Sequence, residues 1–482
     1  MAIPPSTELL GILALDMDFK EAVKNAVEKF KSIDNYRNKV IRIVGNIDTD
    51  GITATSILIK AFIRESIKFL ASVERQVNNE LLTSLSNDSS DIIFFLDFGS
   101  GSISDIEKKL WNKRVFILDH HYPEKFESEA NVVHLNPHIN GIDGSKEIGA
   151  AGIAYFFSKQ LNENNYDLSY LALIGAIGDV QENNGFTGLN TLILDDAIKS
   201  SKVEVNNGLK IFGIQSNPIY KVLEYSTNPY MPGITGSEEG ALKFLQEVGI
   251  KAKEGNRYRK FSDLNTDEVK ILIAAIAIRK LNTTEWNENL FGPIYQLIDE
   301  DEDSPTKELR EYSTLLNSCG RMGKASLGMG VCLGDRSMKD RAVNILHDYR
   351  NEIINSIEWF YRNREKNNIV EKKNYVIVNA EDNVRDTIIG TLMSLISRSG
   401  IYSNGTILIG MARTLGTETK ISVRVSGNSN QDTRNILRDI VSKTGGIYGG
   451  HKLASGATIE QDKEQEFIKL AEEILGNLIV NV

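Results

Sequence analysis

Three short runs of apolar residues near the start of the chain constrain its fold most strongly. The runs VIRIV (40–44), DIIFFLD (91–97) and RVFILD (114–119) are almost continuously apolar and rich in β-branched and aromatic residues. Strands buried on both faces have this pattern, whereas strands with one solvated face alternate. A helical pattern, ITATSILIKAFIRES (52–66), follows the first run. This succession of strand and helix predicts a parallel α/β sheet.

The patterns continue along the chain and predict an α/β protein of several parts. The expected parts are an N-terminal parallel-sheet domain at 1–195, a helical insertion at 196–345, a connecting helix at 346–372 and a smaller α/β domain at 373–482. Within the insertion, Ser304 before Pro305 predicts the start of a helix. A chain of 482 residues is long enough for roughly two to four domains.

The composition excludes several classes of protein. The net charge of −10 gives no overall basic field for coating nucleic acid, so any phosphate must be held by a local patch or by metal. No window approaches the ~20 apolar residues of a membrane span, and the first residues lack a signal-peptide pattern, so we expect a soluble cytoplasmic protein. The cysteines, Cys319 and Cys332, are too few for a disulfide framework, and we expect buried thiols.

Acidic residues stand directly after the predicted strands. Two lie in NIDTDGI after the first run, one in LDFGS after the second, and one in LDHH after the third, where two histidines follow. Another aspartate closes the apolar segment LALIGAIGD. The candidate residues of this pattern are Asp48, Asp50, Asp97, Asp119, His120, His121 and Asp179.

The position of these residues predicts a metal site. Open parallel sheets place their ligands at the carboxyl ends of the strands. One aspartate there is more often a turn or helix cap. Several converging carboxylates, however, raise one another's pKa unless a cation is present. Oxygen ligands with imidazole suit Mn²⁺ or Mg²⁺, so the residues alone predict a two-metal phosphoesterase.

The order of the motifs resembles a known family. NIDTDG, LDFGS, LDHH and GAIGD are similar to the four motifs of the DHH phosphoesterase superfamily, named after its Asp-His-His triplet. TKISVRVS and GGIYGGHKLASGATI resemble the arginine-bearing strand and the glycine loop of the associated DHHA1 domain. LLNSCGRMGKASLGMGVCLGD (315–335) is similar to a stretch of RecJ-type single-strand exonucleases. The likeness is strongest to archaeal RecJ-like proteins, some of which associate with the GINS component of the replicative helicase.

The resemblance implies roles for the candidate residues. One ion, Mn²⁺ or Mg²⁺, would be bound by Asp48 and Asp97, and a second by Asp50, Asp97, His120 and Asp179. His121 would face the scissile phosphate, and Asp119 would orient a histidine. The active site would lie in a cleft between the domains, where the substrate-binding residues would be Arg424, Gly449, Gly450, His451 and His138.

Asn46 departs from the family pattern. Most members have a histidine at this position, and that histidine ligates the first metal. An amide oxygen is neutral and is a weaker ligand than imidazole for transition ions, so we expect a looser first site. All the other ligands are present, which favours an active enzyme.

The resemblance implies a metal-dependent exonuclease for single-stranded DNA or RNA that acts in replication or repair. Two alternatives stay open. A phosphoesterase for short oligonucleotides or nucleotides would not need the middle region. A weakly active or inactive RecJ-like scaffold of the replicative helicase, with GINS as partner, is favoured by Asn46. No motif predicts the direction of digestion, the preference for DNA or RNA, or the oligomeric state.

Overall fold

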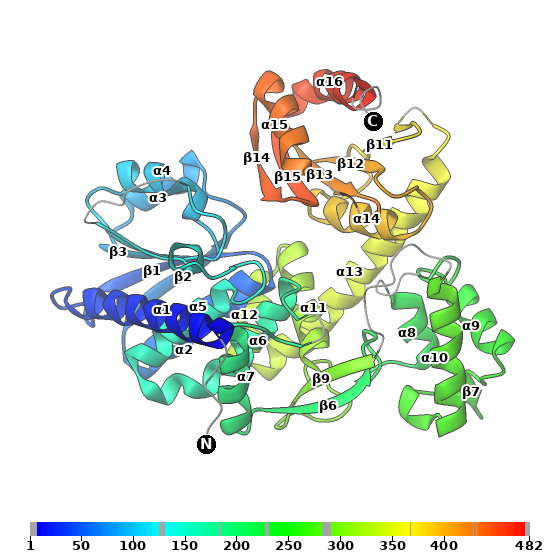
Figure 1. The fold of residues 1–482 in the computed structure, drawn as a ribbon, viewed down its shortest axis with the longest axis horizontal. Coiled ribbons are helices and arrows are strands. Elements are labelled where there is room, and N and C mark those ends of the chain that lie inside the picture. Colours follow the sequence, from blue (N-terminus) through cyan, green and yellow to red (C-terminus); the bar gives the residue numbers. More distant parts are fainter. Residues whose placement is uncertain are drawn as a thin grey trace. The chain divides into compact units, whose positions relative to one another are not determined.

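The computed structural model describes residues 7–124, 131–182, 185–226, 231–281, 291–366, 368–427, 429 and 431–477. The chain divides into two compact units, Met1–Lys210 with Phe291–Leu346 and Ile211–Leu290 with His347–Val482. Figure 1 shows the elements of each unit in chain order. Among the described residues, no helix is both long and apolar enough to cross a membrane.

A five-stranded parallel sheet forms the centre of the first unit, in the order β2–β1–β3–β4–β5. The strands are β1 (Val40–Asn46), β2 (Lys68–Glu74), β3 (Ile92–Leu96), β4 (Arg114–Leu118) and β5 (Val132–Leu135). Every pairing among them is parallel. The prediction of an α/β fold with an N-terminal parallel sheet is therefore confirmed.

Burial on both faces of the sheet explains the continuous apolar runs. In β3, Phe94 and Leu96 belong to the larger hydrophobic core, whereas Ile93 and Phe95 belong to a second core. Helices α1 (Thr7–Lys31), α2 (Thr49–Arg64) and α5 (Ala150–Leu161) contribute to the larger core, with α6 (Ser169–Gly178) and α7 (Leu189–Lys199). Helices α3 (Asn79–Asn87) and α4 (Ile103–Lys109) cover the opposite face (Figure 1).

The remaining elements of the first unit come from the middle of the chain. Strand β6 (Val203–Leu209) pairs antiparallel with β9 (Phe291–Leu297). Helices α11 (Leu309–Arg321) and α12 (Ala325–Leu333) follow, and α13 (Arg336–Asn363) leads into the second unit. Cys319 and Cys332, on α11 and α12, are free and buried, and burial raises the pKa of their thiols to about 12 and about 11.

The predicted helix start at Ser304 is wrong. Helix α11 begins at Leu309, and its N-cap is Glu308, whose side chain accepts a hydrogen bond from the N–H of Glu311. The hydroxyl of Ser304 instead donates to Glu300 at 2.7 Å, within the acidic turn. The competing hydrogen bond explains why Ser304 does not cap a helix.

The second unit combines a helical segment with a mixed sheet. Its helical segment holds α8 (Ile219–Tyr225), α9 (Glu238–Glu247), the hairpin β7 (Lys253–Glu254) and β8 (Arg257–Tyr258), and α10 (Thr266–Leu281). The sheet has the order β10–β11–β12–β13–β15–β14. The region 196–345, expected as one insertion, thus contributes to both units: 196–210 and 291–345 belong to the first, and 211–290 to the second.

The sheet of the second unit has six strands among the described residues. Its strands are β10 (Ile369–Glu371), β11 (Tyr375–Asn379), β12 (Ile407–Arg413), β13 (Glu418–Val425), β14 (Ile447–His451) and β15 (Ala454–Glu460). Its helices are α14 (Asp386–Arg398), α15 (Thr433–Thr444) and α16 (Glu464–Asn477). The prediction of a smaller C-terminal α/β domain is confirmed.

Candidate metal centre

The register of the parallel sheet brings acidic side chains to one edge. Leu96, the last residue of β3, lies beside Leu118, the last residue of β4. The backbone ladder continues beyond both strands, because the N–H of Asp97 donates to Leu118 O at 3.0 Å and the N–H of Asp119 donates to Leu135 O at 3.3 Å. Asp97 and Asp119 therefore leave neighbouring strands at the same edge of the sheet.

Asp97 has an unusual backbone and an unusual environment. Its φ of 67° lies in the left-handed region, which Asp and Asn tolerate better than most other side chains. Its side chain is 1% exposed, and neither carboxylate oxygen has a hydrogen-bond partner in the part of the chain that the structure describes. Burial and the nearby charge of Asp48 raise the pKa of Asp97 well above its ordinary value. The imidazole of His120, with Nε2 3.3 Å from Asp97 Oδ1, is a potential counter-charge for this buried carboxylate.

Asp50 is held by the N-terminus of helix α5. Its two carboxylate oxygens accept hydrogen bonds from the N–H groups of Ala150 (2.5 Å) and Ala151 (3.0 Å). Two glycines leave room for the carboxylate, since a Cβ at Gly149 would lie 2.7 Å from Asp50 Oδ2 and one at Gly175 would overlap Oδ1. Burial and the charge of Asp179 nevertheless raise the pKa of Asp50 to about 7.

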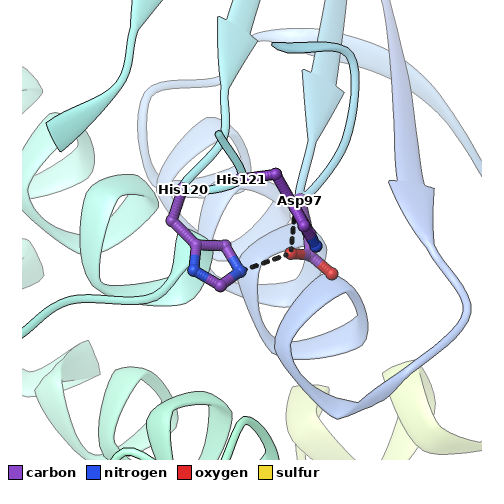
Figure 2. A group of neighbouring side chains, drawn as sticks. All are labelled: Asp97, His120 and His121. Carbon is purple, nitrogen blue, oxygen red and sulfur yellow. Dashed lines mark ion pairs between the residues drawn. The ribbon is translucent and has the colours of Figure 1, made fainter. Parts of the chain in front are cut away.

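The imidazole of His120 connects the carboxylates. Its Nε2 atom lies 3.0 Å from Asp179 Oδ2, 3.3 Å from Asp97 Oδ1 and 3.8 Å from Asp50 Oδ2. Figure 2 shows His120 and His121 with their contacts to Asp97. One potential ligand atom from each of Asp50, Asp97, His120 and Asp179 lies within 4.8 Å of the others. We call these four residues the metal cluster.

The chemistry of the metal cluster fits a divalent cation. Burial lowers the pKa of His120, but the adjacent carboxylates of Asp179 and Asp97 overcome this effect and raise it well above its ordinary value. The three carboxylates of Asp50, Asp97 and Asp179 around the single imidazole of His120 thus favour the binding of positive charge. Nε2 of His120 and both carboxylate oxygens of Asp97 have no hydrogen-bond partner of acceptable geometry among the residues described. Carboxylate and imidazole donors suit Mn²⁺ and Mg²⁺, so a cation at this point would satisfy these buried atoms.

Asp119 holds His121 rather than joining the metal cluster. Its Oδ1 accepts hydrogen bonds from Nδ1 (2.8 Å) and the main-chain N–H (3.1 Å) of His121, and its Oδ2 accepts from the N–H of Ser100 (2.9 Å). Burial would raise the pKa of Asp119, but the charge and hydrogen bond of His121 bring it below its ordinary value. The ring of His121 is 42% exposed, so it is accessible from solvent.

Asp48 and Asn46 lie beside the metal cluster without belonging to it. The side chain of Asp48 caps helix α2 and accepts a hydrogen bond from the N–H of Gly51 at 3.1 Å. The amide oxygen of Asn46 accepts from the N–H of Ile47 at 2.7 Å, and its amide nitrogen donates to the carbonyl of Asp97 at 3.4 Å. Both polar groups of Asn46 are thus used by the backbone around them.

The loop after β5 brings His138 next to the DHH motif. The N–H of His138 donates to Asn136 Oδ1 at 3.0 Å, while the amide of Asn136 donates to the carbonyl of His121 at 2.8 Å. The ring of His138 lies 5.2 Å from that of Tyr122, between centroids. Burial lowers the pKa of His138, which favours a neutral imidazole beside the site.

The predicted substrate-binding residues of the second unit lie on two strands, β13 and β14, that flank β15 in its sheet. Arg424 on β13 lies opposite Ala454 on β15, which in turn lies opposite His451 on β14. The guanidinium of Arg424 donates to Ser394 Oγ at 2.9 Å and to its neighbour's carbonyl. Gly449 and Gly450 precede His451 on β14, and Gly450 has a φ of 123°. That these residues face the metal cluster across a cleft stays a prediction.

Arg321 lies near the candidate site but is absent from the residues predicted from the sequence. This residue ends helix α11, directly after Gly320, where a Cβ would overlap the carbonyl oxygen of Ile47. The end of α11 therefore packs against the loop that carries Asp48. The Nε atom of Arg321 is buried and makes no hydrogen bond to the described residues. The arginine in LLNSCGRMG was the available signal, because it is a basic residue within the stretch similar to RecJ.

Models of known protein families match three parts of the chain. The model of the DHH family N-terminal domain matches residues 40–177, that of the DHH-CID domain matches 211–290, and that of the DHHA1 domain matches 372–477. Uncharacterized protein MJ0831 of Methanocaldococcus jannaschii is 30% identical over 472 residues, which cover 95% of this chain and 97% of that protein.

Solved structures with a similar fold include RecJ and CDC45. RecJ of Thermus thermophilus in complex with Mn²⁺ has a TM-score of 0.57 and 17% identity over 95% of this chain, which spans only 55% of that RecJ chain. An exonuclease RecJ bound to manganese has a TM-score of 0.55 and 17% identity, covering 94% of each chain. CDC45 of Entamoeba histolytica has a TM-score of 0.65 and 14% identity over 95% of this chain and 99% of its own. The chain is a RecJ-like member of the DHH/DHHA1 superfamily.

Proposed function

We propose that this protein is a divalent-metal-dependent exonuclease that hydrolyses phosphodiester bonds of single-stranded DNA or RNA. The observation that carries the proposal is the metal cluster, in which buried potential ligand atoms of Asp97 and His120 have no hydrogen-bond partner within the described ranges. A structural role alone does not account for this cost, because buried polar atoms are normally hydrogen-bonded.

In this proposal, the acidic residues and His120 form two cation-binding positions. Asp50, Asp97, His120 and Asp179 would hold one Mn²⁺ or Mg²⁺, and Asp48 with Asp97 and the weak ligand Asn46 would hold a second. Bound divalent ions at such a site lower the pKa of water and offset charge on phosphoryl oxygens.

His121 and Asp119 would act on the substrate side of the cluster. Nδ1–H of His121 donates a hydrogen bond to Asp119, which fixes the tautomer, and Nε2 would contact a phosphate oxygen or the leaving oxygen. Arg321 in the first unit and Arg424 in the second would hold backbone phosphates, since a guanidinium matches the geometry of a phosphate. Gly449, Gly450 and His451 would complete the phosphate contacts, with His138 as a further one.

Substrate length tests this proposal against the alternative of a small-molecule phosphoesterase. Purified protein with Mn²⁺ is given an end-labelled single-stranded oligonucleotide, the same sequence as a duplex, an RNA version and a dinucleotide. Stepwise shortening of the single strands with little attack on the duplex supports the exonuclease. Turnover of the dinucleotide alone would contradict it.

A scaffold role in the replicative helicase is a second candidate. It is favoured by Asn46, whose amide is already hydrogen-bonded to Ile47 and Asp97. The cation position formed by Asp48 and Asp97 would therefore be weaker than in most of the family. The partner would be GINS, and co-elution of the purified proteins tests this. A scaffold that keeps its nuclease activity is compatible with both proposals, whereas co-elution without any nuclease activity favours the scaffold alone.

A further inference from the structure

The carbonyl oxygen of Gly144 is the centre of a buried hydrogen-bond network. It lies 2.6 Å from Nδ1 of His120, and it accepts a hydrogen bond from Nε2 of Gln181 at 3.0 Å. Oε1 of Gln181 in turn accepts a hydrogen bond from Nδ2 of Asn190 at 2.8 Å. His120 and Gln181 are each 4% exposed, and Asn190 is fully buried. The network thus connects a residue of the metal cluster to two side chains that have no role in the proposed function.

The direction of these hydrogen bonds follows from the groups involved. A carbonyl oxygen only accepts, so Nδ1 of His120 carries the proton and Nε2 presents its lone pair to the carboxylates. For the same reason the nitrogen of the Gln181 amide faces Gly144. Its oxygen therefore faces the amide nitrogen of Asn190, which holds the Gln181 side chain in that orientation.

The backbone around the network leaves little freedom to adjust. A Cβ at Gly144 would overlap the carbonyl oxygen of His120, so the two chain segments are already in close contact. Gln181 is fixed by the turn that ends helix α6, where its N–H donates to Ala176 O at 2.9 Å. In this turn Val180 has a φ of 60°, which a β-branched residue rarely adopts. The turn places Gln181 two residues after Asp179, so one local structure positions both Asp179 and, through Gly144, His120.

We infer that Gln181 is a positioning residue of the metal site, which holds the Gly144 carbonyl and, through it, the imidazole of His120 in the orientation that a cation requires. The inference rests on the proposed function, because it takes His120 as a metal ligand. Groups that hydrogen-bond metal ligands typically contribute about 10- to 100-fold to metal affinity. Gln181 acts through a carbonyl rather than directly on the imidazole, so we expect the lower end of this range.

The test is Mn²⁺ affinity in the absence of nucleic acid. Free Mn²⁺ gives a six-line electron paramagnetic resonance spectrum that is lost on binding, so a titration of the full-length protein yields the dissociation constant. In Gln181→Met, which keeps the side-chain length and removes both hydrogen bonds, we expect binding about tenfold weaker than in wild type. In Asn190→Leu, which leaves Gln181 in place but releases its oxygen, we expect a smaller loss, and this variant serves if Gln181→Met does not fold.

A matched control separates positioning from general stability. Asn165 is also buried, and its amide also donates to a main-chain carbonyl, that of Ser158 at 2.9 Å, away from the metal cluster. Asn165→Leu is expected to lower the unfolding temperature but leave the Mn²⁺ dissociation constant at the wild-type value. Wild-type affinity in Gln181→Met and Asn190→Leu would overturn the inference alone. A wild-type protein that binds no Mn²⁺ would overturn it together with the metal site, whereas Mn²⁺ binding without nuclease activity would contradict only the proposed function.

Discussion

Nε2 of His120, just beyond strand β4, lies 3.0 Å from Oδ2 of Asp179 at the end of helix α6. The same nitrogen lies 3.3 Å from Asp97 Oδ1. Two carboxylates can approach one buried nitrogen in this way only if the imidazole is protonated or if a cation lies between them. A cation would also account for the oxygens of Asp97 that have no hydrogen-bond partner among the described residues.

In Asp97→Asn, the metal-free protein will unfold at a higher temperature than wild type, but Mn²⁺ will no longer stabilise it. Asn tolerates the left-handed backbone of this position, and the change removes a buried charge. Mn²⁺ at about 100 times its dissociation constant adds about 2.7 kcal/mol to the wild-type protein. Thermal unfolding in EDTA and in Mn²⁺ measures both effects. The exposed Asp195 on α7 provides the control, since Asp195→Asn should keep the full response to Mn²⁺.

Asn46→His will tighten the weaker of two Mn²⁺ sites. In wild type we expect one tight site at the metal cluster and a weaker one at Asp48 and Asp97, because the amide of Asn46 is neutral and already hydrogen-bonded. An imidazole is a stronger ligand for transition ions. Calorimetric titration with Mn²⁺ will resolve the two classes of site. A single class of two equal sites in wild type would be inconsistent with this assignment.

His121→Gln will reduce turnover without much change in Mn²⁺ affinity. His121 is held by Asp119 and is partly exposed, so its proposed contact is with the substrate. Loss of one group that contacts the reacting atoms typically costs about 10²- to 10⁴-fold in rate. The kcat and the Mn²⁺ dissociation constant are measured on the same preparation. If the affinity for Mn²⁺ falls in parallel with kcat, His121 is a metal ligand instead.

Arg321→Ala will weaken binding of single-stranded DNA and reduce its dependence on salt. Removing one phosphate contact lowers the slope of log affinity against log salt by about 0.7 for single strands. Fluorescence anisotropy in EDTA measures binding without cleavage. Lys199, exposed at the end of α7, is the control, because Lys199→Ala should leave both affinity and slope unchanged. An unchanged slope in Arg321→Ala would exclude the proposed phosphate contact.

Glu308→Gln will make stability less dependent on pH. Burial raises the pKa of Glu308 to about 7, and the neighbouring Arg310 only partly opposes this. The folded protein therefore binds this proton more tightly than the unfolded chain. The resulting stabilisation is complete below the ordinary pKa of 4.5 and is lost as the pH rises to about 7.

Urea unfolding across this pH range tests the assignment to Glu308. Relative to the Gln variant, the wild type should lose as much as ~3 kcal/mol of unfolding free energy between the two pKa values. Glu80→Gln changes an exposed carboxylate on α3 and should leave the pH dependence as in wild type. Parallel curves for wild type and Glu308→Gln would show that Glu308 does not titrate in this way.

The parallel sheet was predictable because burial on both faces leaves a local signature. In β3 the consecutive residues Phe94 and Phe95 point to opposite faces and pack into different cores, so the whole run is apolar. Strand β2 was missed because none of its residues is fully buried, and β14 because its residues 447–450 are exposed and include two glycines. The division of the middle region depends on contacts such as the β6–β9 pairing, which join distant segments and leave no local pattern.

The candidate site was partly predictable for a similar reason. Asp97 and Asp119 stand directly after strands, so the sheet rule that places ligands at strand ends applies to them. The network of Gln181, Gly144 and His120 follows no such rule, because it joins a helix end, a turn and a strand end through side-chain and carbonyl contacts. Only the three-dimensional structure brings these groups together.

The most direct test of metal-dependent exonuclease activity is degradation of end-labelled single-stranded DNA and RNA by wild type and Asp97→Asn, with Mn²⁺, Mg²⁺ or EDTA. We predict progressive shortening by wild type with Mn²⁺ or Mg²⁺, no cleavage in EDTA, and no cleavage by Asp97→Asn with any metal. Folded wild-type protein that cleaves neither polymer with either metal, or an Asp97→Asn variant as active as wild type, would contradict this account.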